Sequence, residues 1–146
     1  MKKPTNILLA EDDADDRELF LEAMFLVDPK IRVATVENGE KLMTHLKESD
    51  IYPDCIFLDL NMPKKNGKEC LVEIRTDEKT QKIPVVIYTT SFNRTDIDET
   101  FMRGATCFIR KPNSFKELTS LLAKYIASAS VTPNSYKGKG NFLLNS

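Results

Sequence analysis

Short apolar runs alternate along the chain with stretches of helical periodicity. Five runs are expected to be β-strands: Asn6–Ala10, Arg32–Val36, Cys55–Leu58, 85–88 and 107–109. Most of them are continuously apolar, which is typical of parallel strands covered on both faces of a sheet. The run Arg32–Val36 is β-branched but partly polar, so it is expected at an edge of that sheet.

The stretches between these runs are expected to be helices. Asp13 is a candidate N-cap for a helix that begins near Ala14 and is closed by Pro29. The apolar face of this helix is expected to comprise Leu19, Phe20, Ala23, Met24 and Val27. Further helices are predicted at 39–49, 68–76, 96–103 and 114–126, the last capped by Asn113 or Ser114. Repeated strand–helix alternation predicts an α/β fold with an open, doubly wound parallel sheet.

Length and composition narrow the class of protein. The 146 residues suit one domain, and 41% hydrophobic with 29% charged residues is ordinary for a globular chain. A formal net charge of -1 argues against a nucleic-acid binder that relies on a strongly basic surface. No apolar run approaches the length of a membrane span, and the N-terminus lacks a signal-peptide pattern. The expected location is cytoplasmic, with no membrane insertion.

The cysteine pattern indicates buried, reduced thiols. Cys55, Cys70 and Cys107 are odd in number and widely spaced, and they form no CxxC pair. The single histidine, His45, is expected to have no functional role, so a zinc site is not predicted either.

Polar residues follow four of the predicted strands. They are Glu11 and Asp12 after the first, Asp59 after the third, Thr89 at the end of the fourth, and Lys111 after the fifth. Each has an ordinary reading by itself, such as an acidic helix N-terminus or a turn residue. Ligands of doubly wound sheets bind at the carboxyl ends of the strands, so these side chains are expected to converge there.

This combination suggests phosphoryl chemistry. Three carboxylates in one crevice repel one another unless a cation intervenes, and Mg²⁺ prefers oxygen ligands, including a phosphate oxygen. An aspartate carboxylate can attack phosphorus to form an acyl phosphate. Lys111 would then offset the charge of the phosphoryl oxygens, and Thr89 would donate a hydrogen bond to one of them.

Over about residues 6–127 the chain resembles the receiver domain of two-component response regulators. The matching segments are ILLAEDD at 7–13, FLDLNMP at 57–63 with Gly67, VIYTT at 86–90, and Gly104-Ala105 with FIRKP at 108–112. The loop 59–67 is especially similar to that of stand-alone receivers associated with phytochrome-type sensor kinases. The resemblance implies a flavodoxin-like sheet of strand order 2-1-3-4-5. Gly67 is expected to permit a positive φ in the loop.

The resemblance also implies a phosphoacceptor and a metal site. Asp59 would be the phosphorylated nucleophile. Asp12 would bind Mg²⁺ directly, Glu11 would act mainly through a metal-bound water, and Asp59 and the backbone carbonyl of Asn61 would supply further ligands. Asp13 remains an alternative member of the acidic pair.

A lysine and a switch complete the implied site. Lys111 would pair with the acceptor or its phosphate, and the Lys111–Pro112 peptide bond would be cis. Thr89 would move toward the phosphoryl group while the ring of Phe108 turns inward. Phe108 lacks a hydroxyl, and a plain core role for it stays open; Thr90 stands where the family often has alanine and is small enough to admit a phosphodonor.

The expected function is a phosphoacceptor switch that takes a phosphoryl group from a sensor histidine kinase or a histidine phosphotransfer protein. Its output would be binding to a downstream protein target, a homodimer through its fourth helix, fifth strand and fifth helix, or transfer of the phosphoryl group onward in a relay. It would catalyse only its own phosphorylation and dephosphorylation. A haloacid-dehalogenase-type phosphatase needs a second acid two residues after the nucleophile, where Asn61 stands. A receiver-like scaffold that takes no phosphate is disfavoured because the acidic pair, Asp59 and Lys111 are all present.

The C-terminal region has a different composition. Residues 128–140 are rich in Ser, Gly, Pro, Asn and Lys, which is typical of a flexible connector. We therefore expect a receiver domain at 1–127 and a tail at 128–146 with no separate output domain. Phe142 and Leu143 are expected to pack on the domain or on a neighbouring subunit.

Overall fold

A parallel sheet with strand order β2-β1-β3-β4-β5 forms the centre of the described structure. The computed structural model describes residues 3–131 and 142–144. Its elements are β1 (Asn6–Ala10), α1 (Ala14–Val27), β2 (Arg32–Val36), α2 (Gly39–Glu48), β3 (Cys55–Leu58), α3 (Gly67–Thr76), β4 (Val85–Thr89), α4 (Arg94–Met102), β5 (Cys107–Arg110) and α5 (Phe115–Val131). The predicted doubly wound fold and its strand order are confirmed.

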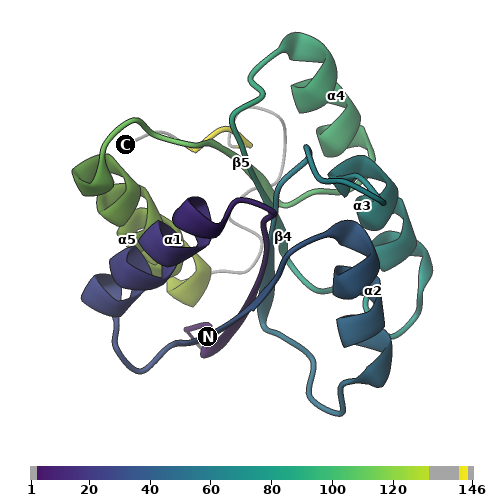
Figure 1. Ribbon diagram of the computed structural model, residues 1–146, viewed down its shortest axis with the longest axis horizontal. Coiled ribbons are helices and arrows are strands. Elements are labelled where there is room, and N and C mark those ends of the chain that lie inside the picture. Colours follow the sequence, from purple (N-terminus) through teal and green to yellow (C-terminus); the bar gives the residue numbers. More distant parts are fainter. Residues whose placement is uncertain (1–2, 132–141, 145–146) are drawn as a thin grey trace.

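Helices cover both faces of the sheet. Helices α1 and α5 lie on one side, and α2, α3 and α4 lie on the other (Figure 1). Side chains of a strand alternate between the faces, so Ile7 and Leu9 of β1 join the core beneath α1 and α5. Leu8 and Ala10 join the core beneath α2 and α3. Burial on both faces explains why most strands are apolar throughout.

The partly polar strand lies at an edge, as predicted. Strand β2 pairs in parallel with β1, and all of its side chains are exposed or partly exposed. Strand β5 ends the order on the opposite side, next to β4. The most buried strands, β1, β3 and β4, therefore lie in the interior of the sheet.

Side-chain caps set where the helices begin. The carboxylate of Asp13 accepts a hydrogen bond at the start of α1, and Ser114 Oγ does the same for α5. Asn93 caps α4, which begins at Arg94, two residues before the predicted start at 96. Helix α5 continues to Val131, beyond the predicted end at 126 and past the expected domain boundary at 127. Within the described ranges, no helix has the length and apolar character needed to cross a bilayer.

The predicted buried face of α1 is correct except at one position. Phe20, Ala23 and Met24 are buried against the sheet, and Val27 is partly buried. Leu19 is 43% exposed, so its predicted burial is wrong. The helix carries apolar residues on several sides, and only the i, i+3, i+4 set that begins at Phe20 meets the sheet.

Gly67 is needed for close packing rather than for a left-handed backbone. Among the described residues, the positive φ angles are at Lys64 and Gly104, so the expectation for Gly67 is wrong. A Cβ atom on Gly67 would lie 2.3 Å from the backbone oxygen of Asp59. The missing side chain therefore lets the start of α3 pack directly against the strand end that carries Asp59.

The cysteines are buried and free, as predicted. Cys55, Cys70 and Cys107 lie in the two cores, and none of them is in a disulfide. Burial raises the pKa of the Cys55 thiol to about 12, so this sulfur stays protonated and unreactive at neutral pH.

Candidate functional site: a carboxylate cluster at the carboxyl edge

Backbone hydrogen bonds of the sheet continue past the strand ends and position the acidic residues. The amide of Glu11 donates to the carbonyl of Val36 at 3.0 Å, one residue beyond β1. The amide of Asp59 donates to the carbonyl of Ala10 at 3.1 Å, one residue beyond β3. Adjacent parallel strands thus place both side chains at the same edge.

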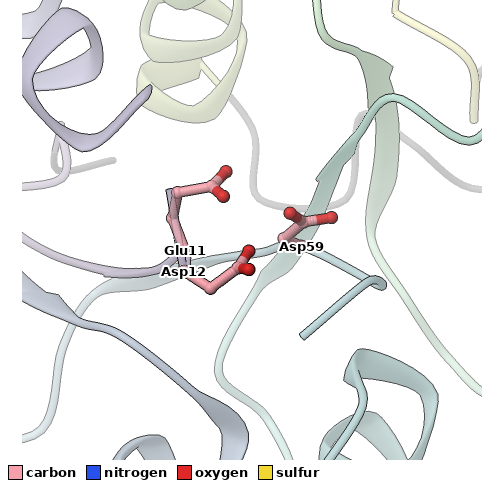
Figure 2. Close-up of side chains that lie close together, drawn as sticks. All are labelled: Glu11, Asp12 and Asp59. Atoms are coloured by element: carbon pink, nitrogen blue, oxygen red, sulfur yellow. The ribbon is translucent and has the colours of Figure 1, made fainter. Parts of the chain in front are cut away.

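Three carboxylates meet at this edge. One oxygen from each of Glu11, Asp12 and Asp59 lies within 4.8 Å of the others (Figure 2). Glu11 and Asp59 are buried, whereas Asp12 is exposed. Asp13, the alternative member of the pair, instead turns its carboxylate to the α1 backbone, accepting from the amide of Asp16 at 3.0 Å.

Lys111 lies against the cluster. Its ammonium is 2.5 Å from a carboxylate oxygen of Glu11, 2.9 Å from one of Asp16 and 3.3 Å from one of Asp59. Asp16 was not a candidate from the sequence. It lies four residues after Asp12 in the first turn of α1, and this spacing could have indicated a shared face.

The lysine is held by a trans peptide bond. No cis peptide occurs among the described residues, so the expected cis bond between Lys111 and Pro112 is wrong. An X–Pro bond favours trans by about 0.5–1 kcal/mol unless the surroundings demand otherwise. Here the ammonium reaches the carboxylates with the trans bond, and the amide of Lys111 donates to the carbonyl of Thr89 at 2.9 Å.

Burial and charge shift the ionisation of two groups. Burial raises the pKa of Glu11 to about 7, although the hydrogen bond from Lys111 opposes the shift. Burial lowers the pKa of Lys111, but the hydrogen bonds to Glu11 and Asp16 and the charge of Asp59 outweigh it and raise the pKa above its ordinary value. The site therefore keeps its lysine charged and holds one carboxylate close to its titration point at neutral pH.

This shift predicts pH-dependent metal binding. Only the ionised Glu11 attracts a cation, so affinity for a divalent metal should fall about tenfold between pH 8 and pH 6. Titrating Mg²⁺ calorimetrically at several pH values would measure this, and Glu11→Gln should flatten the dependence.

In the metal-free protein, the stability contributed by Glu11 changes with pH in the opposite direction from the metal affinity. Because the folded state prefers protonated Glu11, its contribution to stability is complete below the ordinary pKa of 4.5 and is lost as the pH rises through about 7.

Thr89 and Asn61 lie on either side of Ser91. Thr89 is fully buried at the end of β4, and its hydroxyl oxygen accepts from the amide of Ser91 at 3.3 Å. The Asn61 side chain donates to Ser91 Oγ at 2.9 Å, and its backbone amide donates to the Asp59 carboxylate at 3.1 Å. The loops after β3 and β4 are thereby connected beside Asp59.

Phe108 is buried in β5 rather than at the rim. Its side chain is 1% exposed and belongs to the core that α2 and α3 cover. Its ring centroid lies 6.3 Å from that of Phe92 and 6.1 Å from that of Phe142. Phe142 is also fully buried, so the expectation that this part of the tail packs on the domain is confirmed.

The carboxylate cluster fits a hard divalent cation. Apart from its ion pair with Lys111, the buried oxygen Oε1 of Glu11 makes no hydrogen bond to the described residues. The donors are all oxygen atoms, and two of the three carboxylates are shielded from water. Such a site suits Mg²⁺ or Mn²⁺ better than a metal that prefers nitrogen or sulfur.

A buried aspartate between two further carboxylates and a lysine is the arrangement required by a signalling domain that is phosphorylated on aspartate, and comparison with known proteins supports this class. Residues 7–123 match the response regulator receiver domain. Response regulator Rcp1 of Synechocystis is 32% identical over 124 residues, covering 82% of this chain and 84% of Rcp1. The chain therefore belongs to the receiver-domain family of response regulators, which act in phosphorelay signal transduction.

Solved structures agree with this family. The phosphorylated cyanobacterial phytochrome response regulator RcpA superposes with a TM-score of 0.80 at 32% identity, covering 92% of this chain and 99% of RcpA. The Mn²⁺-bound form of Rcp1 gives 0.79 at 30% identity, covering 88% of this chain and 96% of Rcp1. Likeness in both sequence and fold thus extends over nearly the whole described structure.

Proposed function

We propose that the protein accepts a phosphoryl group on Asp59 and changes conformation in response. The observation that carries this proposal is the position of Asp59, buried between the oxygen ligands of Glu11 and Asp12 and the ammonium of Lys111. The donor would be the phosphohistidine of a sensor histidine kinase or a histidine phosphotransfer protein. Similarity to RcpA favours a phytochrome-type kinase.

The transfer is a direct displacement at phosphorus. A carboxylate oxygen of Asp59 forms the new P–O bond, the P–N bond of the donor breaks, and the imidazole nitrogen keeps the electron pair. Lys111 compensates charge on the phosphoryl oxygens, and the Thr89 hydroxyl donates to one of them. When bound, Mg²⁺ would neutralise further negative charge; Asp12, Glu11, Asp59 and the carbonyl of Asn61 are its proposed ligands.

The proposed switch begins at Thr89. Its hydroxyl leaves the amide of Ser91 for the phosphoryl group, and the ring of Phe108 moves into the vacated space. The surface of α4, β5 and α5 then changes shape and presents a binding site for a downstream target or a second copy. The protein promotes its own phosphorylation and dephosphorylation and turns over no separate substrate.

The test uses acetyl phosphate as the donor. Incubation with Mg²⁺ should add one phosphoryl group to the intact mass, and prior chelation of the metal should prevent the gain. Reduction with borohydride followed by peptide mapping should place the modification at Asp59. A phosphoryl group on another residue, or uptake that ignores the chelator, would contradict the proposal. If acetyl phosphate fails as a donor, tight beryllofluoride binding remains the required result.

A further inference from the structure

Residues 142–144, here called the C-terminal strap, extend the sheet beyond β5. The amide of Phe108 donates to the carbonyl of Phe142 at 2.8 Å, and the amide of Leu144 donates to the carbonyl of Phe108 at 3.0 Å. Phe108 and Leu143 thereby form a parallel β-bridge. The strap lies alongside β5 (yellow in Figure 1) and satisfies backbone groups at an edge that would otherwise face solvent.

The strap is packed like part of the core. Phe142 is fully buried, and its ring centroid lies 5.3 Å from that of Phe101 in α4. Leu144 is 8% exposed and belongs to the core beneath α1 and α5. Leu143 lines a shallow hollow with Phe92 and residues of α4. The strap therefore occupies the surface of α4, β5 and α5 that the proposed switch would alter.

Phe108 connects the strap to the phosphorylation site. Both of its backbone hydrogen-bonding groups contact the strap, and its ring lies close to those of Phe142 and Phe92. On its other side β5 pairs with β4, whose last residue is Thr89. Movement of the Phe108 ring toward Thr89 would therefore change its packing against Phe142.

We propose that docking of the C-terminal strap and phosphorylation of Asp59 oppose each other through Phe108. This inference rests on the proposed function and adds to it a mutual antagonism between strap docking and phosphorylation. Phosphorylation draws the buried Phe108 ring toward the space that the Thr89 hydroxyl vacates, its packing against Phe142 weakens, and the strap leaves the β5 edge. The strap is short, and the gain from burying its apolar side chains is offset by the entropy lost when it is ordered, so a modest change can release it.

Release would uncover a docking site for a partner of defined chemistry. The exposed edge of β5 and the pocket of Phe142 would accept an extended segment with an aromatic residue followed by aliphatic ones. Such a segment adds a strand through main-chain hydrogen bonds and takes its specificity from the pocket. In the unphosphorylated protein, the strap itself fills this site.

Amide hydrogen exchange in the whole 146-residue chain measures directly whether the strap is docked. The Leu144 amide should be protected in the free protein because it bonds to Phe108. Addition of Mg²⁺ and beryllofluoride, the phosphate mimic, should remove that protection. The Leu9 amide, in the interior strand β1, should remain protected and serves as an internal control.

Reciprocity supplies a second test. If the phosphate mimic weakens the strap, weakening the strap must strengthen binding of the mimic. Phe142→Ala should therefore tighten beryllofluoride binding by about fivefold, and Phe142→Leu should have a smaller effect in the same direction. Leu46→Ala removes a comparably buried side chain from α2, away from the strap, and should leave the affinity unchanged.

The outcomes separate the two proposals. If beryllofluoride binds while Leu144 protection and the affinity of Phe142→Ala both match the parent, the coupling is refuted and the proposed function stands. If beryllofluoride fails to bind at all, the proposed function fails and the coupling fails with it. Protection of Leu144 that disappears on dilution would place the strap on a second copy and overturn the intramolecular contact.

Discussion

Replacing Asp59 by alanine is expected to abolish phosphoryl uptake from acetyl phosphate. Asp59 is the buried carboxylate that lies against Glu11, Asp12 and Lys111, and under the proposed function its loss removes the nucleophile itself. Intact-mass measurement in the presence of Mg²⁺ should show no gain of a phosphoryl group. The unfolding free energy should change by only about 1 kcal/mol, because Lys111 keeps Glu11 and Asp16 as partners and one repulsive charge is removed.

The matched control is Asp13→Ala. This variant also removes one carboxylate from the acidic stretch after β1, but Asp13 caps α1 and lies outside the cluster. It should retain phosphoryl uptake while losing about 1 kcal/mol of stability, the usual contribution of an N-cap. Stable acyl phosphate on Asp59→Ala, or loss of uptake only in Asp13→Ala, would show that the nucleophile or the acidic pair is wrongly identified.

Replacing Lys111 by alanine is expected to uncouple metal binding from the conformational response. The carboxylate ligands remain, so Mg²⁺ should still bind. The phosphate mimic should no longer change the NMR spectrum at α4, β5 and α5, because no ammonium reaches its oxygens. Removing one partner of a buried ion pair leaves uncompensated charge, and the metal-free variant should lose about 3 kcal/mol of stability.

The stability lost in Lys111→Ala should depend on pH and on metal if uncompensated charge is its cause, whereas a simple packing defect would depend on neither. Without Lys111 the pKa of Glu11 rises further, so the destabilisation should be greater at pH 8 than at pH 6. Mg²⁺ should restore more stability to Lys111→Ala than to the parent, because it supplies the missing positive charge. Lys116→Ala, which removes an exposed lysine from α5, should show neither effect. A loss independent of pH and metal would contradict the electrostatic explanation.

Much of the architecture could be predicted from local patterns. Continuous apolar runs identified β1, β3, β4 and β5, and partial polarity placed β2 at an edge. Asp13 and Ser114 were found as helix caps because capping depends on residues only three apart. The convergence of Asp59 with Glu11 and Asp12 followed from one general rule, that ligands of parallel sheets gather at the carboxyl ends of strands.

The features that the sequence prediction missed or placed wrongly depend on tertiary packing and not on local pattern. The exposure of Leu19, the contact between Asp16 and Lys111, and the close approach of Gly67 to Asp59 all depend on how separate elements pack. The side chain of Asp16 meets a lysine 95 residues away, and no spacing within α1 reveals that partner. Burial, rather than residue type, also raises the pKa of Glu11 to about 7.

The sequence by itself determined the order of strands and helices, the family and most of the chemical groups at the carboxyl edge, because these depend on short-range pattern and on motifs. Only the tertiary structure decided which groups touch. The carboxylates of Glu11, Asp16 and Asp59 surround the ammonium of Lys111 because distant segments pack together. The same packing places the C-terminal strap against Phe108. Contacts between distant segments depend on the packing of the whole chain, and that packing determines the charge state of the site and what covers its proposed output surface.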